Sequence, residues 1–231
     1  MTGSKKIGTN KKAGVENPAF SAYPSFNLEL SLLKKGYRFI AGIDEAGRGA
    51  LAGPLSVGIA LFSDSFIRKP DMEIFLVNDS KKLSHKKRLL AEEIIRKHSL
   101  YCGFEFIDNE VIDEININRA TELAIYALLG RLPVKPDIVM IDGNFNFNLG
   151  TPCRPVVKGD AISISIASAS VMAKTGRDRV MVEKDGLYPE YGFSSNKGYG
   201  TKRHIDAIIR TGITPLHRKS YEPVKSILLP E

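Results

Sequence analysis

Two adjacent carboxylates, Asp44 and Glu45, stand at the end of an apolar run and directly before a Gly-Arg-Gly turn. The apolar run of residues 39–43 predicts a β-strand, and the glycines predict the turn that ends it. Carboxylates are hard oxygen ligands that suit Mg²⁺ or Mn²⁺. Glycines beside an arginine let backbone N–H groups approach a ligand without obstruction by a Cβ atom. The segment therefore predicts a strand that brings a metal site and a phosphate- or sugar-binding loop together.

Two further aspartates follow apolar runs in the same way. Asp142 closes the run of residues 138–141, and Asp160 follows the predicted edge strand of residues 154–157. Side chains at strand ends of α/β sheets are held rigidly and face solvent, where ligands bind. Successive residues of a strand point to opposite faces, so Asp44 and Glu45 share one metal site only if the strand twists or breaks there. Converging carboxylates repel one another, and divalent cations remove that cost.

Other chemistries lack their sequence patterns. The chain has no His-x-x-x-His pair, Cys-x-x-Cys pair, P-loop, dinucleotide-binding glycine fingerprint or Gly-x-Ser-x-Gly elbow. The histidines are scattered, and each is expected to be structural or exposed. Cys102 and Cys153 lie far apart, which indicates free thiols in a reducing compartment. Because no apolar stretch approaches the roughly 20 residues of a membrane span, and residues 1–14 lack a secretory core, a cytoplasmic protein is expected.

The formal net charge of +7 favours a polyanionic partner such as nucleic acid. The placement of the charge is more informative than its sum, because the acidic pairs and the basic residues lie in different parts of the chain. The basic residues of the C-terminal part are Lys197, Lys202, Arg203, Arg210, Arg218 and Lys219, with His204 and His217 among them. We expect this part to form a basic binding surface beside the acidic metal site.

Alternating strand and helix signals predict an α/β fold with a mixed central β-sheet flanked by helices. Strands are expected at residues 39–43, 55–61, 101–107, 138–141 and 154–157. Helices are expected at residues 84–97, with Ser84 as N-cap and Leu90, Ala91, Ile94 and Ile95 on the inner side, at 119–129 capped by Asn118, at 161–183 and at 201–211. The many Ala and Ser residues of the helix at 161–183 predict close backbone packing.

Three parts are predicted along the chain. Residues 1–36 are expected to be a basic, poorly ordered N-terminal arm with a short helical lead-in, because lysines lie among Gly, Ser and Asn there. Residues 37–185 are expected to form the α/β core. Residues 186–231 are expected to form a C-terminal helical region that binds the substrate.

Several blocks of the sequence add a resemblance to these patterns. They are GIDEAGRGALAGP at 42–54, NDSKKLS at 78–84, IDG at 141–143, VKGDAISISIASASVMAK at 157–174, RDRVM at 177–181, YGFSSNKGYGTKRH at 191–204 and TPLHRKSYEPV at 214–224. In this order they resemble ribonuclease HII, the bacterial type 2 ribonuclease H, which implies a ribonuclease H-like core. The related HIII form usually departs at the arginine of the Gly-Arg-Gly turn and carries an extra N-terminal domain.

The resemblance implies a role for each matching residue. Asp44, Glu45 and Asp142 would bind divalent metal, with Asp160 as the fourth catalytic carboxylate, and the cofactor would be two Mg²⁺ or Mn²⁺ ions. Contacts to the ribose 2′-OH and to phosphates at the RNA–DNA junction would come from Gly47, Arg48 and Gly49. Tyr199 would stack on the deoxynucleotide just past the junction, and Lys81 would contact a phosphate. Asp178 is expected to be structural, paired with a nearby arginine.

The chain departs from the family pattern at three places. Ala50 stands where the loop often has Pro, and Ile162 stands where Lys is frequent. The pair Thr175-Gly176 puts a glycine in a helix where β-branched residues are usual. No departure removes a predicted metal ligand, so activity is expected.

The resemblance implies an endoribonuclease that acts by two-metal-ion catalysis. It would hydrolyse the RNA strand of RNA–DNA hybrids and cut 5′ of single ribonucleotides in duplex DNA, as in DNA repair and replication, giving 3′-OH and 5′-phosphate ends. The partners would be these nucleic acids and no membrane, and a monomer is expected. Two alternatives on a ribonuclease H-like scaffold stay open: a non-catalytic nucleic-acid-binding protein and a recombinase-type nuclease. The intact carboxylates argue against the first, and the Gly-Arg-Gly turn with Tyr199 against the second, because the 2′-OH is what distinguishes RNA.

Overall fold

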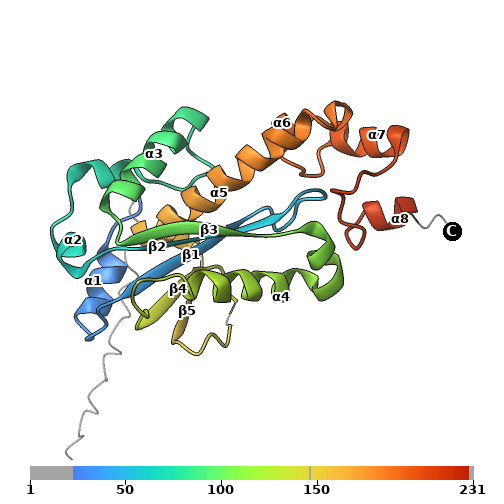
Figure 1. Cartoon of the computed structure of the whole chain (residues 1–231). Coiled ribbons are helices and arrows are strands. Elements are labelled where there is room, and N and C mark those ends of the chain that lie inside the picture. The colour runs from blue at the N-terminus through green and yellow to red at the C-terminus, as the bar shows by residue number, and fades with distance from the viewer. Residues whose placement is uncertain (1–22, 146, 229–231) are drawn as a thin grey trace, which may run out of the picture.

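The computed structural model describes residues 23–145 and 147–228. Within them a mixed sheet has the strand order β3-β2-β1-β4-β5 (Figure 1). Its strands are β1 (Ile40–Ala46), β2 (Leu55–Leu61), β3 (Tyr101–Ile107), β4 (Ile138–Asp142) and β5 (Cys153–Val156). β1 pairs antiparallel with β2 and parallel with β4; β2 pairs antiparallel with β3, and β4 pairs parallel with β5. The predicted α/β fold with a mixed sheet is confirmed.

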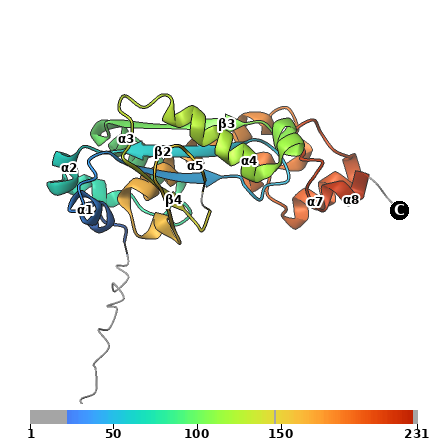
Figure 2. The same ribbon diagram turned by 90° about the horizontal axis from the view of Figure 1, so that it is seen from below.

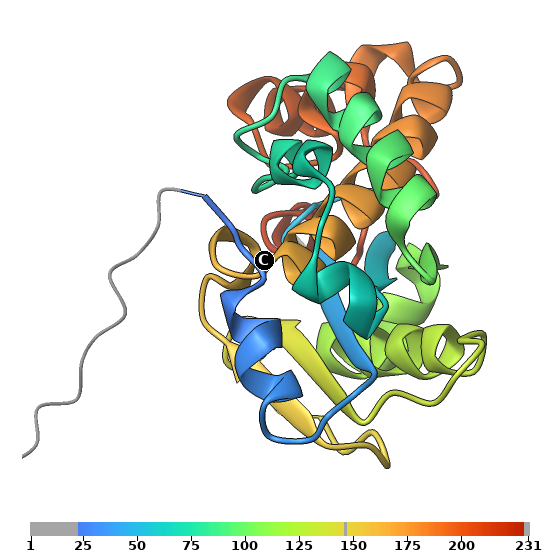
Figure 3. The same ribbon diagram turned by 90° about the vertical axis from the view of Figure 1, so that its left-hand side faces the viewer.

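Helices cover both faces of the sheet, and α3 and α4 lie on opposite sides of it in Figure 3. One face carries α5 (Ile164–Asp185), α3 (His85–His98) and α1 (Asn27–Leu33), and the other carries α4 (Asn109–Leu129). Side chains of a strand point alternately to the two faces of the sheet. In β1, Ile40 packs against the first group of helices, and Ile43 packs on the face that α4 covers. Because both faces are covered, β1 and β2 are buried along almost their whole length, and most of their residues are apolar.

The shorter helices complete the chain. They are α2 (Asp64–Arg68), η1 (Met72–Leu76), η2 (Gly159–Ala161), η3 (Pro189–Tyr191), α6 (Phe193–Asn196), α7 (Lys202–Thr211) and α8 (Val224–Leu228). The helices α7 and α8 lie at the end of the molecule opposite α1 (Figure 2). Among the described helices, none is long and apolar enough to cross a membrane.

Two glycines let α5 lie almost on the sheet. A Cβ atom at Gly42 would be 2.3 Å from the backbone carbon of Ser165, and one at Gly58 would be 2.1 Å from the carbonyl oxygen of Ala169. Side chains in these positions would push helix and sheet apart. The close backbone packing predicted from the Ala and Ser residues is therefore confirmed. The glycine at position 176 is explained by the same kind of close contact, since a Cβ atom there would lie 2.8 Å from the ring of Phe104.

Two helices differ from the prediction, α3 in which residues face inward and α4 in where it begins. Ser84 caps α3 as predicted, because its hydroxyl accepts a hydrogen bond from Lys87 N–H, but Leu90 is 48% exposed and not on the inner side. Helix α4 begins at Asn109, not at residue 119, and the non-helical Asn116 (φ 66°) interrupts it. The side chain of Asn116 accepts hydrogen bonds from the N–H groups of residues 118 and 119, so Asn116 caps the second half in place of Asn118.

The described part of the predicted N-terminal arm belongs to the folded core. Residues 1–22 lie outside the described residues, but Phe26 and Leu32 are buried, and Phe26 packs edge-on against Phe62 at 5.4 Å. Glu29 of α1 is fully buried and accepts hydrogen bonds from Ser163 Oγ (2.6 Å) and from a backbone N–H at the start of α5. Helix α1 is the predicted helical lead-in, and because these apolar side chains and one carboxylate hold it against the core, residues 23–36 are not a poorly ordered arm.

The C-terminal helices rest on the loop between β1 and β2. Their buried side chains form a third apolar cluster with Leu51 and Ala52 of that loop and with Met181 of α5. The N–H group of Leu51 also donates to the carbonyl oxygen of Gly198 at 2.8 Å. The loop that carries the Gly-Arg-Gly turn is therefore held between the sheet and the C-terminal region.

Candidate active site

Three of the four predicted carboxylates converge at one edge of the sheet. Asp44 comes from β1, Asp142 ends β4, and Asp160 lies in η2 directly after β5. Each offers a carboxylate oxygen, and these oxygens lie within 4.8 Å of one another. The parallel pairing of β1 with β4 matches Ile43 with Ile141, so the next residue of each strand is an aspartate at the same level. Strand pairing thus explains the convergence.

Asp44 is the most buried member of this group, with 3% of its surface exposed. Its Oδ1 atom accepts a hydrogen bond from Glu45 N–H at 2.7 Å, and its Oδ2 atom is buried without a hydrogen-bond partner among the described residues. Burial, with the neighbouring charge of Glu45, raises the pKa of Asp44 well above its usual range. A buried, unpartnered carboxylate oxygen is costly, and a divalent cation is the kind of partner that offsets the cost.

The other two aspartates are tied to the same turn. The N–H group of Gly159 donates to Asp142 Oδ1 at 2.6 Å, which links the end of β4 to η2. Burial raises the pKa of Asp160, and the charge of Asp142 adds to the shift. Lys81 Nζ lies 3.9 Å from Asp160 Oδ2. Burial lowers the pKa of Lys81, but Asp44 and Asp160 outweigh it, and the net shift is upward. Lys81 is therefore a cation at the edge of the acidic group.

Glu45 is not part of the three-carboxylate group. Strand β1 continues through this residue to Ala46, and Glu45 is paired in register with Val57. The strand does not break between Asp44 and Glu45, and the carboxylate of Glu45 stays outside the group of three, although its charge raises the pKa of Asp44. Glu45 nevertheless lies near the site: burial raises its pKa, while the charge of Arg48 lowers it and that of Asp142 raises it.

The first glycine of the Gly-Arg-Gly turn is required by its surroundings. Gly47 has φ 87°, and a Cβ atom there would lie 2.0 Å from Nε of Arg177. Its N–H group donates to the hydroxyl of Tyr199 at 3.1 Å. The turn and Tyr199, which are 152 residues apart in the sequence, therefore meet directly. Tyr199 is 37% exposed, and Lys174 and Arg177 lie over its ring at 6.0 and 5.4 Å.

Arg48 is held by residues that the sequence did not indicate. Its guanidinium donates to Thr121 Oγ1 (3.2 Å) and to the side-chain oxygen of Asn118, and it lies 4.3 Å from the centre of the Phe145 ring. Asn118 and Thr121 belong to α4 and Phe145 to the loop after β4. No local sequence pattern connects these positions, so only the folded chain reveals the contact.

Arg177 is a fully buried cation that joins three segments. Its guanidinium donates to the carbonyl oxygens of Pro54 (2.8 Å), Ala52 (3.0 Å) and Lys197 (2.7 Å). Burial lowers its pKa to about 10, so it stays charged at neutral pH. Arg177 therefore fixes the loop between β1 and β2 to α5 and to the segment that carries Tyr199.

Arg218 makes a second buried tie to the same loop. It is fully buried and donates to the carbonyl oxygens of Arg48 (2.9 Å) and Gly53 (3.0 Å). Its assignment to the basic binding surface is therefore wrong, and His204 and His217 are also buried. The charge of a basic residue in the sequence does not show whether its side chain is buried, as that of Arg218 is, or exposed on the binding surface. Of the basic side chains predicted to form that surface, Lys202, Arg203, Arg210 and Lys219 are exposed.

Asp178 is an ion-pair partner, as predicted. Its carboxylate lies 2.8 Å from Lys174 Nζ and 3.6 Å from an Nη atom of Arg88. The contact with Arg88 joins α5 to α3. Asp178 is therefore a structural residue in this arrangement.

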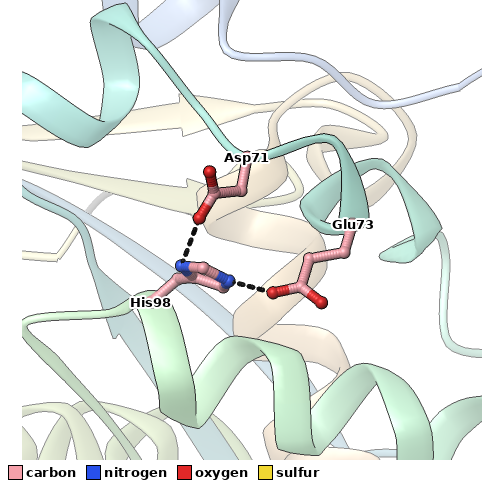
Figure 4. Close-up of side chains that lie close together, drawn as sticks. All are labelled: Asp71, Glu73 and His98. Carbon is pink, nitrogen blue, oxygen red and sulfur yellow. Dashed lines mark hydrogen bonds and ion pairs between the residues drawn. The ribbon is translucent and has the colours of Figure 1, made fainter.

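A second group of possible ligands, Asp71, Glu73 and His98, lies away from the aspartates (Figure 4). Asp71 approaches Nδ1 of the imidazole at 3.5 Å, and Glu73 contacts Nε2. A single metal ion cannot bind both ring nitrogens of His98, because Nδ1 and Nε2 point in different directions. Lys97 also pairs with Glu73 at 2.5 Å. These contacts fix η1 to the end of α3, and His98 has a structural role there.

Comparison with known proteins identifies relatives over most of the chain. The family model described as Ribonuclease HII matches residues 41–224. The chain is 48% identical over 194 residues to Ribonuclease HII of Clostridioides difficile (strain 630), covering 84% of this chain and 73% of that protein. It is 48% identical over 204 residues to Ribonuclease HII of Caldicellulosiruptor bescii, covering 88% and 95%. The fold is similar to that of the ribonuclease H2 from Pyrococcus horikoshii OT3, with TM-score 0.69, 23% identity and coverage of 82% and 96%.

Proposed function

The chain belongs to the ribonuclease HII family and is a ribonuclease H that acts on RNA–DNA hybrids, and we propose that it also cuts duplex DNA on the 5′ side of a single embedded ribonucleotide. The observation that carries the proposal is the convergence of Asp44, Asp142 and Asp160 beside the Gly47 turn and Tyr199. Such an arrangement places an acidic centre next to groups that can contact a sugar. Membership of a ribonuclease family does not fit either alternative, a recombinase-type nuclease or a non-catalytic binding protein.

The acidic centre fits divalent cations. Asp44, Asp142 and Asp160 would hold them, with Glu45 as a further ligand, and the unpartnered Oδ2 atom of Asp44 is suited to a cation. Two bound Mg²⁺ or Mn²⁺ ions would activate water and stabilise the leaving oxygen, which gives 3′-OH and 5′-phosphate ends. The chain itself keeps the carboxylates at rigid strand ends and places Lys81 where a phosphate would meet a positive charge.

Recognition of the sugar is assigned to the turn and the tyrosine. Backbone groups of Gly47, Arg48 and Gly49 read a 2′-OH without reading a base, so cleavage depends on the sugar far more than on the sequence. Tyr199 is fixed at its hydroxyl by Gly47 N–H, and its ring is partly exposed next to the turn. A ring in that place stacks on the nucleotide that follows the ribonucleotide.

One assay tests the proposal directly. Three duplexes are compared: one with a single embedded ribonucleotide, one with a tract of ribonucleotides, and one of DNA alone. We expect cleavage of the first two, with a cut 5′ of the lone ribonucleotide, in Mg²⁺ or Mn²⁺ and none in chelator. Cleavage of the tract without cleavage at the lone ribonucleotide would refute the proposed role of the Gly47 turn and Tyr199 at the RNA–DNA junction. Equal cleavage of the DNA duplex would remove sugar recognition altogether.

The exposed face of α7 is proposed as a phosphate-binding surface. A surface hollow of about 680 Å³ is lined by Lys202, Arg203 and Arg210 together with Glu190 and Asp206. Replacing Lys202 and Arg203 by alanine should weaken duplex binding uniformly across sequences. Each lost phosphate contact should shallow the slope of log K against log[salt] by roughly 0.9 for B-form DNA. Binding titrations at several salt concentrations measure the slope.

A matched variant controls for net charge. Lys34→Ala with Lys35→Ala removes two exposed charges next to α1, at the opposite end of the molecule (Figure 1). The salt slope of this variant should equal that of the wild type. If both double variants change the slope equally, the effect is general charge and α7 is not the binding face.

A further inference from the structure

Two histidines meet in the interior of the C-terminal region. His204 of α7 and His217 are both fully buried, and their Nε2 atoms are 3.1 Å apart. The Nδ1 atom of His204 lies 3.0 Å from the carbonyl oxygen of Tyr199. The Nδ1 atom of His217 lies 2.9 Å from the backbone nitrogen of Thr214. A single chain of hydrogen bonds therefore runs from Thr214 through both rings to Tyr199.

The direction of this chain is fixed by its first donor. A backbone N–H can only donate, so Nδ1 of His217 must be the acceptor and carries no proton. The neutral ring then has its proton on Nε2, which donates to Nε2 of His204. His204 must therefore carry its own proton on Nδ1, where it faces the Tyr199 carbonyl. Both tautomers follow from one backbone N–H group.

Neither ring can be charged without breaking the chain. A proton on Nδ1 of His217 would face the N–H of Thr214, and a proton on Nε2 of His204 would face that of His217. Burial lowers the pKa of His204, and burial together with His204 lowers that of His217 to about 4. Both rings are therefore neutral at pH 7, as the chain of hydrogen bonds requires. The aromatic rings of Tyr191 and Phe193 pack against both imidazoles, with ring centroids 5.1 to 6.3 Å apart.

We propose that His204 is a positioning residue that sets the place of Tyr199 at the Gly47 turn, and that His217 fixes the tautomer of His204 through this relay of hydrogen bonds. The relay holds the backbone of Tyr199 at its carbonyl, while Gly47 N–H holds the hydroxyl at the other end of the side chain. Both ends of Tyr199 are thus fixed before substrate arrives, which lowers the ordering cost of stacking. The inference rests on the proposed role of Tyr199 at the junction.

Two substitutions of one histidine separate positioning from packing. The side-chain amide of asparagine lies near the place of Nδ1, so His204→Asn keeps a donor for the Tyr199 carbonyl. The amide of glutamine reaches the place of Nε2, so His204→Gln keeps the contact to His217 and loses that donor. The readout is the ratio of cleavage rates at a lone ribonucleotide and within a ribonucleotide tract, with Tyr199→Ala as the benchmark.

We expect His204→Gln to lower this ratio by about fivefold or more, toward the value of Tyr199→Ala, and His204→Asn to keep it near that of the wild type. Equal ratios for the two variants would mean that His204 only fills space, and would overturn the proposal. Melting temperatures of both variants are measured beside the rates, because a packing role would follow stability and not the identity of the amide.

A measurement on the wild-type protein reports the two tautomers directly. Long-range ¹H–¹⁵N spectra of the imidazoles should show the proton on Nδ1 of His204 and on Nε2 of His217 at pH 7. The chain has four histidines, so the signals are assigned by their loss in the variants. Charged rings or the reverse tautomers would refute the relay even if the wild type cleaves as proposed. Correct tautomers in a protein that ignores a lone ribonucleotide would instead refute the role of Tyr199, and with it the positioning role.

Discussion

Replacing Asp44 or Asp142 by asparagine is expected to abolish cleavage while leaving duplex binding nearly unchanged. Each substitution removes a carboxylate charge from the acidic group but none of the exposed basic side chains. Catalytic groups that act as a unit lose activity together, so a loss of about a thousandfold or more is expected for either variant. Single-turnover cleavage and binding titrations in Mg²⁺ measure the two properties separately.

The stability of the Asp44 variant provides a second readout. Burial raises the pKa of Asp44, so the ionised form is less favoured in the folded than in the unfolded protein. This cost is present at neutral pH and disappears as the pH falls through the raised pKa. In chelator at pH 7, Asp44→Asn should therefore melt at the same temperature as the wild type or above it. A variant that is both less stable and merely slower would indicate a structural role.

Asp178→Asn is the matched control, because Asp178 is also a nearly buried aspartate. Its carboxylate has two cationic partners, Lys174 and Arg88, and it lies outside the acidic group. Its loss should lower the melting temperature and leave the cleavage rate of the folded protein within about threefold. Near-normal turnover by Asp44→Asn or Asp142→Asn would contradict the two-metal assignment, whatever the control shows.

The strands were predictable because their signal is local. The apolar runs that became β2 and β3 are bounded by turn residues, and their limits match the prediction. The approach of Asp44 and Asp142 could also be predicted, since Asp44 lies near the end of β1 and Asp142 ends the neighbouring parallel strand β4. Glu45 shows the limit of such reasoning. Whether a strand stops at a carboxylate or continues past it depends on pairing with Val57 of the next strand, which the turn glycines did not reveal.

The basic C-terminal residues were harder to interpret, because charge does not report burial. Arg203 and Arg218 are both arginines of the C-terminal part, yet one is exposed and the other is enclosed against the carbonyl oxygens of the turn. The difference arises from contacts across 165 and 170 residues of sequence. The same holds for the Asn116 cap, whose positive φ no helix pattern indicates.

Replacing Arg177 by methionine is expected to damage stability and cleavage together. The substitution keeps most of the side-chain volume and removes the donors to the carbonyl oxygens of Pro54, Ala52 and Lys197. A buried acceptor that loses a charged donor costs about 1 to 3 kcal/mol, so the free energy of unfolding should fall by roughly 3 kcal/mol or more. Urea unfolding measures this loss.

The expected effect on cleavage follows from what Arg177 joins. It holds the loop that carries Gly47 against the segment that carries Tyr199, and the absence of a Cβ atom at Gly47 leaves the space that its guanidinium occupies. Without it, the turn and the tyrosine lose their common support, and cleavage at a lone ribonucleotide should fall by at least about tenfold under conditions where the variant remains folded. Arg179→Met, two residues along the same helix, is the control: its exposed side chain pairs with Glu92, which keeps Arg96 as a partner. That variant should change stability by about 1 kcal/mol or less. Equal behaviour of the two variants would show that the buried guanidinium is not the tie that organises the site.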